Sequence, residues 1–360
     1  MESYIADVKC LQQFMEDGSF LMPEIPAALR ALQALGAPDY MDYDFLMSIT
    51  GMAVRLAWQP GWAAYQGLPN QAVFPDGTGF DYALRALDGA GAKYIVKSLT
   101  DTVLARKEIQ AAIDKGKPVL LDEPFVCSTV LGYKENVLYG VSTFAPPEER
   151  TQPYQYNPLN SWCEQTKRYV LIERLLPQPV DRQLLAQTIK RAITMARTSE
   201  CQQHPGAAMG LSAFDALAEM LVWDESFQIF NDDLSYTGEI PWPYHRPEGY
   251  WREDGAHSLA DRFWAGYCDF LCMLNGYENM SRFLNKYADI VPEWRERVLS
   301  AAGYYQKACD YSGELWKYVT PDEEGVRKFR LPEVRYTFAA HMLRAKMYTL
   351  KAVEELEKIG

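Results

Sequence analysis

The chain has 360 residues, of which 48% are hydrophobic and 23% are charged, and its formal net charge is −12. This length suits two compact domains better than one, and the composition is that of a globular protein rather than a disordered one. The negative charge disfavours nucleic acid and anionic membrane surfaces as partners, and no run of about 18 apolar residues predicts a membrane-spanning helix.

The N-terminus and the cysteines predict a cytoplasmic location. The first residues lack the positive segment followed by an apolar segment that is typical of a signal peptide. The seven cysteines are an odd number and are scattered along the chain. This usage fits reduced thiols in a reducing compartment better than a disulfide framework.

The first half of the chain mixes predicted helices and strands. A helix is expected over residues 23–35, where a proline opens the segment, apolar residues recur on one face and Gly36 ends it. A second helix is expected over residues 43–58, with Gly51 at a close packing contact inside it. Further helices are predicted at 80–87 and 102–115, and strands at 94–96, 118–121, 125–131 and 137–144, the last two joined as a β-hairpin.

The second half is predicted to be helical. Residues 145–161 contain four prolines and no periodicity, which predicts a boundary between an α+β domain at 1–150 and a helical domain at 151–360. Residues 168–176 form an apolar run of either type that could still belong to the sheet. Helices are expected at 181–197, 211–223, 257–274, 280–290, 293–319 and 331–359, with a long aromatic loop at 224–255 that covers another surface.

The order of elements in the first half resembles a known fold. An early helix is followed by Ile49-Thr50-Gly51-Met52-Ala53, then by the sequence GKPVLL at 116–121, a strand that runs into Gly132-Tyr133, and another strand. This resembles the papain-like, C39-peptidase-like fold, and within it the N-terminal domain of the butirosin-biosynthesis-protein-H type. Domains of that type occur in acyltransferases and in uncharacterised bacterial proteins that carry a helical partner domain.

The catalytic positions that the resemblance implies are not matched. Such enzymes place a nucleophilic Cys at the start of the first helix, a His on the strand before the Gly-Tyr turn and an Asp or Asn on the next strand. Here the three segments read SFLMP at 19–23, FVCSTVL at 125–131 and VST at 141–143. All four histidines lie after residue 200. A Cys–His pair contained in the first domain is therefore impossible, and a thiol near neutral pH needs such a base or a cation to become nucleophilic.

The first hypothesis is a catalytically degenerate papain-like protein that binds a small molecule or peptide in a cleft between its domains. Aromatic residues in turns and loops are typical of a ligand-contacting surface, and an arginine can bind a ligand carboxylate. Equally, these aromatics could fix loops onto the body of the protein, and the arginine could form a surface ion pair. The predicted ligand-binding residues are Arg55, Trp58, Trp62, Glu123, Trp242 and Trp251.

Two alternatives stay open. In the first, the chain is a thiol-dependent acyltransferase or amide hydrolase, with Cys127 as nucleophile and His257 or His245 of the helical domain as base. Against this, free cysteines in strands are commonly buried packing residues, which is the alternative interpretation of Cys127. In the second, the chain is an interaction protein that forms a homodimer through helices 293–319 and 331–359. No cofactor motif occurs, and the pair Cys268 and Cys272 has no further ligands nearby in the sequence, so neither cofactor nor metal is expected.

Overall fold

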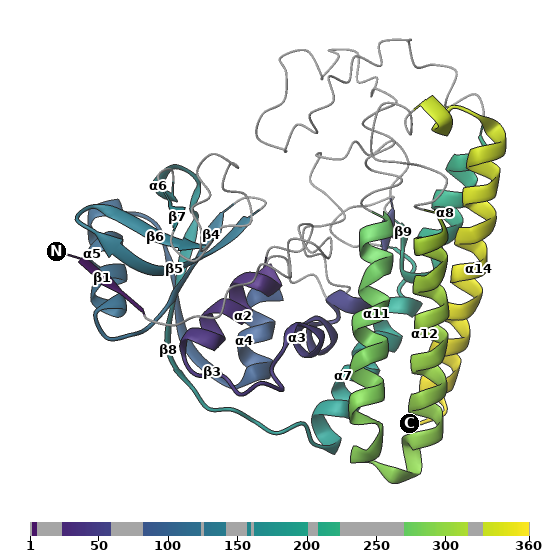
Figure 1. Cartoon of the computed structure of the whole chain (residues 1–360), viewed down its shortest axis with the longest axis horizontal. Coiled ribbons are helices and arrows are strands. Elements are labelled where there is room, and N and C mark those ends of the chain that lie inside the picture. Colours follow the sequence, from purple (N-terminus) through teal and green to yellow (C-terminus); the bar gives the residue numbers. More distant parts are fainter. Residues whose placement is uncertain are drawn as a thin grey trace. The chain divides into compact units, whose positions relative to one another are not determined.

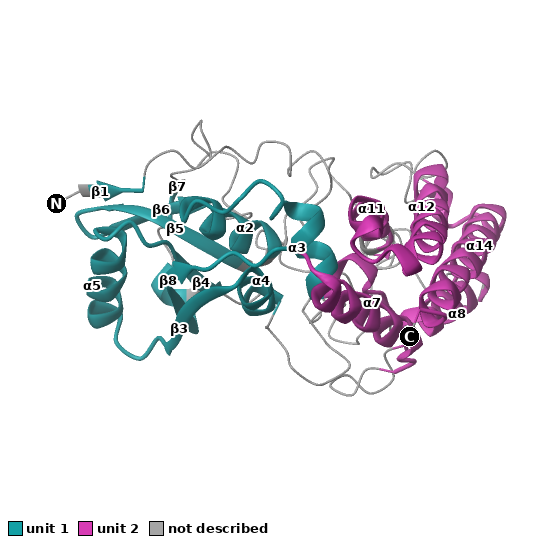
Figure 2. Ribbon diagram, turned by 90° about the horizontal axis from the view of Figure 1, so that it is seen from below, with its two compact units in different colours: residues 1–50, 80–179 teal, residues 51–79, 180–360 magenta. Residues whose placement is uncertain are grey.

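The chain divides into two compact units, an α+β unit and a helical unit, which are coloured separately in Figure 2. Unit 1 comprises Met1–Thr50 and Phe80–Pro179, and unit 2 comprises Gly51–Gly79 and Val180–Gly360. The computed structural model describes residues 2–5, 24–58, 82–123, 126–141, 157–159, 162–200, 208–223, 270–315 and 327–359.

A seven-stranded antiparallel sheet forms the centre of unit 1 (Figure 1). The strand order is β3-β8-β4-β5-β6-β7, and β1 pairs with the end of β5 beyond the residues that β4 covers. The strands are β1 (Glu2–Tyr4), β3 (Ala92–Ser98), β4 (Val119–Glu123), β5 (Val126–Lys134), β6 (Val137–Val141), β7 (Asn157–Pro158) and β8 (Arg168–Leu175).

Helices cover both faces of this sheet because successive side chains of a strand point to opposite faces. On one face, the Thr129 hydroxyl of β5 donates to the Ala27 carbonyl of α2 (Glu24–Ala34) at 2.8 Å. Behind α2 pack α3 (Tyr43–Thr50) and α4 (Tyr82–Ala90). On the other face, Ile109 and Ile113 of α5 (Thr102–Ile113) pack on a core that includes Val130.

The second helix was predicted over residues 43–58, but the observed helix, α3, ends at Thr50, so the prediction is wrong beyond that residue. Gly51 has φ +88°, a left-handed conformation that ends α3, and a short 3-10 turn, η2 (Met52–Val54), follows. A Cβ atom at Gly51 would lie 3.0 Å from Cδ of Arg191, so the expected close contact at this glycine is present. The segment then forms β2 (Ala57–Trp58), a strand of unit 2.

The division between the units also differs from the predicted boundary at residue 150. The run at 168–176 is β8, which pairs with β3 on one side and β4 on the other, so the sheet of unit 1 extends well past the proline-rich segment.

The predicted hairpin is confirmed: β5 and β6 are joined by a two-residue turn in which Glu135 has φ +54°. The predicted helices at 23–35 and 102–115 correspond to α2 and α5.

The described residues of unit 2 form a bundle of long helices and a small β-ribbon. The helices are α7 (Arg182–Arg197), α8 (Gly210–Val222), α11 (Phe270–Tyr287), α12 (Arg295–Leu315) and α14 (Pro332–Glu357). α11 runs without interruption through residues 275–279, where the sequence predicts a break between two helices. The ribbon pairs β2 with β9 (Ala208–Met209).

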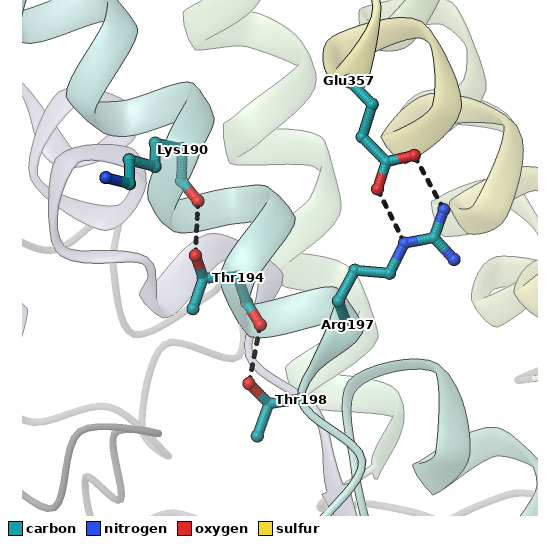
Figure 3. A network of polar contacts seen from close by, with 5 residues as sticks. All are labelled: Lys190, Thr194, Arg197, Thr198 and Glu357. Carbon is teal, nitrogen blue, oxygen red and sulfur yellow. Dashed lines mark hydrogen bonds and ion pairs between the residues drawn. The ribbon is translucent and has the colours of Figure 1, made fainter. Parts of the chain in front are cut away.

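Helix α14 is fixed at both ends by arginine. At its start, the buried Arg335 donates to the carbonyls of Leu221, Phe329 and Arg330, which places a cation at the C-terminus of α8. At its end, Glu357 accepts two hydrogen bonds of 2.8 Å from Arg197 of α7 (Figure 3). In the described part of the chain, no helix is long and apolar enough to cross a membrane.

A substitution at Gly276 tests how closely α11 packs against η2 in unit 2. A Cβ atom at this position would lie 2.9 Å from the Ala53 carbonyl oxygen, whereas one at Gly303 of α12 would meet nothing within 4 Å. We expect Gly276→Ala to lower the free energy of unfolding by about 1–3 kcal/mol through overpacking. The matched change Gly303→Ala should raise it by up to about 1 kcal/mol, the helix-propensity gain. Denaturant unfolding measures both, and equal effects would contradict the close contact.

Candidate functional site

The residues predicted to bind a ligand or to react are only partly within the described structure. Trp62, Trp242, Trp251 and His257 lie outside the described residues. The backbone of Glu123 ends β4, but its side chain is likewise outside the description. The described candidates, Cys127, Arg55 and Trp58, lie in two different units.

Cys127 lies on β5, directly opposite Asp122 of β4. Asp122 in turn lies opposite Arg168 of β8 and accepts a charge-assisted hydrogen bond from its Nε atom. Cross-strand partners share one face of a sheet, so these three residues are neighbours on the face that carries α2. The sequence did not indicate this arrangement, because Asp122 and Arg168 are 46 positions apart.

The Cys127 side chain is buried, with 1% of its surface exposed. Its cross-strand neighbour is a carboxylate, and the guanidinium of Arg168 is bound to that carboxylate. A reactive thiol needs exposure and a cation or base that stabilises the thiolate. The surroundings of Cys127 are therefore those of a packed strand residue.

The other described thiols do not supply a nucleophile–base pair either. Burial, reinforced by the charge of Glu278, raises the pKa of Cys309 to about 11, so this thiol is protonated at neutral pH. Among the described residues the one histidine is His341, whose ring contacts that of Tyr311. Burial and the nearby Arg344 lower the pKa of His341. Cys163 is half-buried in α6 (Trp162–Gln165) of unit 1.

Arg55 and Trp58 belong to the helical unit, although the sequence placed them in the α+β domain. Both side chains are 1% exposed. Trp58 pairs with Ala208 in the β2–β9 ribbon, and the Leu56 carbonyl accepts a 3.0 Å hydrogen bond from the backbone N–H of Gly210, the first residue of α8. These contacts bring the segment from Arg55 to Trp58 to the N-terminus of α8.

The polar groups at this position are hydrogen-bond donors. Within the described structure the indole N–H of Trp58 is buried and has no acceptor. Arg55 contributes a buried guanidinium, which carries only donors. Met209, which precedes α8, offers no side-chain acceptor to the first turn of the helix, where the helix dipole is positive. The chemistry that complements the indole N–H of Trp58 is an anionic or carbonyl acceptor.

The described residues show no group of three or more His, Cys, Asp or Glu side chains placed to hold a metal ion. The pair Cys268 and Cys272 is not part of this finding, because Cys268 and the side chain of Cys272 lie outside the described residues.

Comparison of the chain with protein-family models and with curated proteins found no match.

Native-state alkylation tests the packing of Cys127. We expect its thiol to resist iodoacetamide from neutral pH up to about pH 9, because neither solvent nor reagent reaches it, and to react once denaturant unfolds the chain. Mass spectrometry of peptides resolves this position from the half-buried Cys163 in the same sample. Rapid native labelling of Cys127 below neutral pH would instead reveal an accessible thiolate.

Proposed function

We propose that the chain is a catalytically degenerate papain-like protein that binds a small molecule or peptide bearing a carboxylate or another strong acceptor. Its location is the cytoplasm. The binding residues are Arg55 and Trp58 of the helical unit. The observation that carries the proposal is the buried indole N–H of Trp58, which has no acceptor among the described residues and lies on the segment that carries the buried Arg55.

The loss of catalysis rests on the residues that occupy the reactive positions. The strand on which the fold places its base is β5, and there the chain has the buried Cys127 opposite a carboxylate. No histidine occurs anywhere in the sequence before residue 200. The papain-like assignment is supported by the early helix α2, which packs on this strand through the hydrogen bond between Thr129 and Ala27. The described cysteines are free thiols, in keeping with a reducing compartment.

Ligand binding is expected because the unpaired, buried indole N–H destabilises the ligand-free protein, and a ligand acceptor would remove that free-energy cost. A buried N–H without an acceptor costs roughly 1–3 kcal/mol relative to one that is hydrogen-bonded. A ligand carboxylate would satisfy the indole N–H of Trp58, and such charge-assisted hydrogen bonds are about twice as strong as neutral ones. Because both side chains are buried, the ligand enters by displacing protein that covers them.

Thermal unfolding with a panel of probes tests this function. The probes are dicarboxylic acids, N-acetyl amino acids and short peptides, each paired with the amide that lacks the negative charge. We expect at least one carboxylate to raise Tm by a few degrees, since a ligand present at about 100 times its Kd adds about 2.7 kcal/mol. The matched amide should raise it less. The absence of any carboxylate-specific shift would contradict the proposal.

A pair of tryptophan variants locates the site. Trp58→Phe keeps an aromatic ring but removes the indole N–H, so the Tm shift caused by an active carboxylate should fall by at least half. The control is Trp162→Phe in unit 1, at a tryptophan that is also buried. It should lower the stability of the ligand-free protein by about 1–3 kcal/mol through lost packing and leave the ligand-induced shift intact. An unchanged ligand response in the Trp58 variant would place the site elsewhere.

A further inference from the structure

An exposed apolar stripe runs along the outer face of α14. Tyr336, Leu343 and Met347 are 43%, 46% and 43% exposed, Ala340 is exposed and Leu350 is half-buried. These five residues, which we call the α14 stripe, recur at alternating spacings of four and three. That spacing keeps them on one side of a helix and is the repeat with which two helices pack along each other.

The stripe is held on a fixed helix. α14 packs against both α12 and α8 (Figure 2). Arg335 fixes its start, Glu357 fixes its end (Figure 3), and in its middle Lys346 binds both carboxylate oxygens of Asp215 of α8, at 2.6 and 2.5 Å. All three contacts are made by residues outside the stripe. These contacts hold α14 independently of the apolar side chains that the stripe exposes.

The two flanks of the stripe carry opposite charges. On the side next to α12, the exposed Arg344 and Lys351 follow the stripe, and Lys351 lies 5.5 Å from the ring centroid of Tyr348. On the side next to α8, Asp215 and Glu219 are one turn apart, and because Asp215 is bound to Lys346, the negative charge of this flank comes from Glu219. α8 runs antiparallel to α14, because Arg335 contacts Leu221 and Lys346 contacts Asp215. Arg344 therefore lies at nearly the same height along α14 as the acidic flank.

We propose that the α14 stripe is the interface of a homodimer, in which two copies pack stripe to stripe with their α14 helices parallel. A two-fold axis along α14 brings the basic flank of each copy opposite the acidic flank of the other, whereas an antiparallel pairing would place each flank opposite itself. Arg344 of one copy then faces Glu219 of the second. The charges select the parallel arrangement, and this inference is independent of the proposed ligand.

The size of the interface sets its strength. From Tyr336 to Leu350 the stripe is about 21 Å long at 1.5 Å per residue. Helix pairs of this length, with the flanking side chains, bury on the order of 1,000 Å² in total, the lower end of specific interfaces. We therefore expect a reversible dimer with a dissociation constant in the micromolar range.

Sedimentation velocity of the full chain, from low micromolar to roughly 100 μM, tests the interface. The expected species at the high end has twice the chain mass of 41.1 kDa. Leu343→Glu should weaken the dimer at least about 30-fold, because it places a charge at the centre of the apolar contact. The matched control Val103→Glu changes an apolar residue of α5 that is 59% exposed and should leave the dimer unchanged. A parent chain that stays monomeric, or a dimer insensitive to Leu343→Glu, would overturn the proposal.

A charge exchange tests the parallel orientation. Arg344→Glu should weaken the dimer several-fold, because it places like charges opposite each other. Combining it with Glu219→Arg should restore most of the affinity, since the exchanged charges again face their opposites. Failure of the second change to restore the dimer would overturn the parallel arrangement. Unfolding curves of every variant establish that the fold is kept.

Discussion

The burial of residues 51–58 inside the helical unit is the constraint on which the rest of the chain depends. Gly51 ends α3 with its left-handed conformation, η2 packs on α11 at Gly276, and the Leu56 carbonyl accepts the first backbone N–H of α8. A helix that begins at residue 210 thus obtains its first acceptor from residue 56. The two units are consequently not joined by a single linker, and a cut at residue 150 would leave the sheet without β8.

The sequence predicted those elements that have one apolar and one polar face. α5, α7 and α8 bury one stripe each, so their periodicity marks them with bounds close to those observed. The same reasoning failed at residues 51–58, because that segment is buried on every side and its apolar run looks like a helix. The strands β2 and β9 have two residues each, too few for a periodic pattern, so the ribbon that fixes Trp58 could not be found in advance.

The surroundings of Cys127 depend on strand register, which the local sequence does not specify. The sequence contained the thiol, the carboxylate and the guanidinium, but their proximity requires β4 to lie between β5 and β8, and β8 comes last of these in the chain. Of the two interpretations of Cys127, its burial agrees with the packing residue. The guanidinium of Arg168 is bound to Asp122, the cross-strand neighbour of Cys127.

Two features of the helical unit cost free energy that the other described residues do not recover. The indole N–H of Trp58 is buried without an acceptor among the described residues, and the α14 stripe exposes apolar side chains on a helix that is already fixed by Arg335, Lys346 and Glu357. A ligand acceptor would satisfy the N–H of Trp58. A second apolar surface would bury the side chains of the α14 stripe. The first feature is polar and internal, whereas the second is apolar and external. One ligand could not relieve both, so the proposed ligand site and the proposed dimer interface are separate parts of the unit.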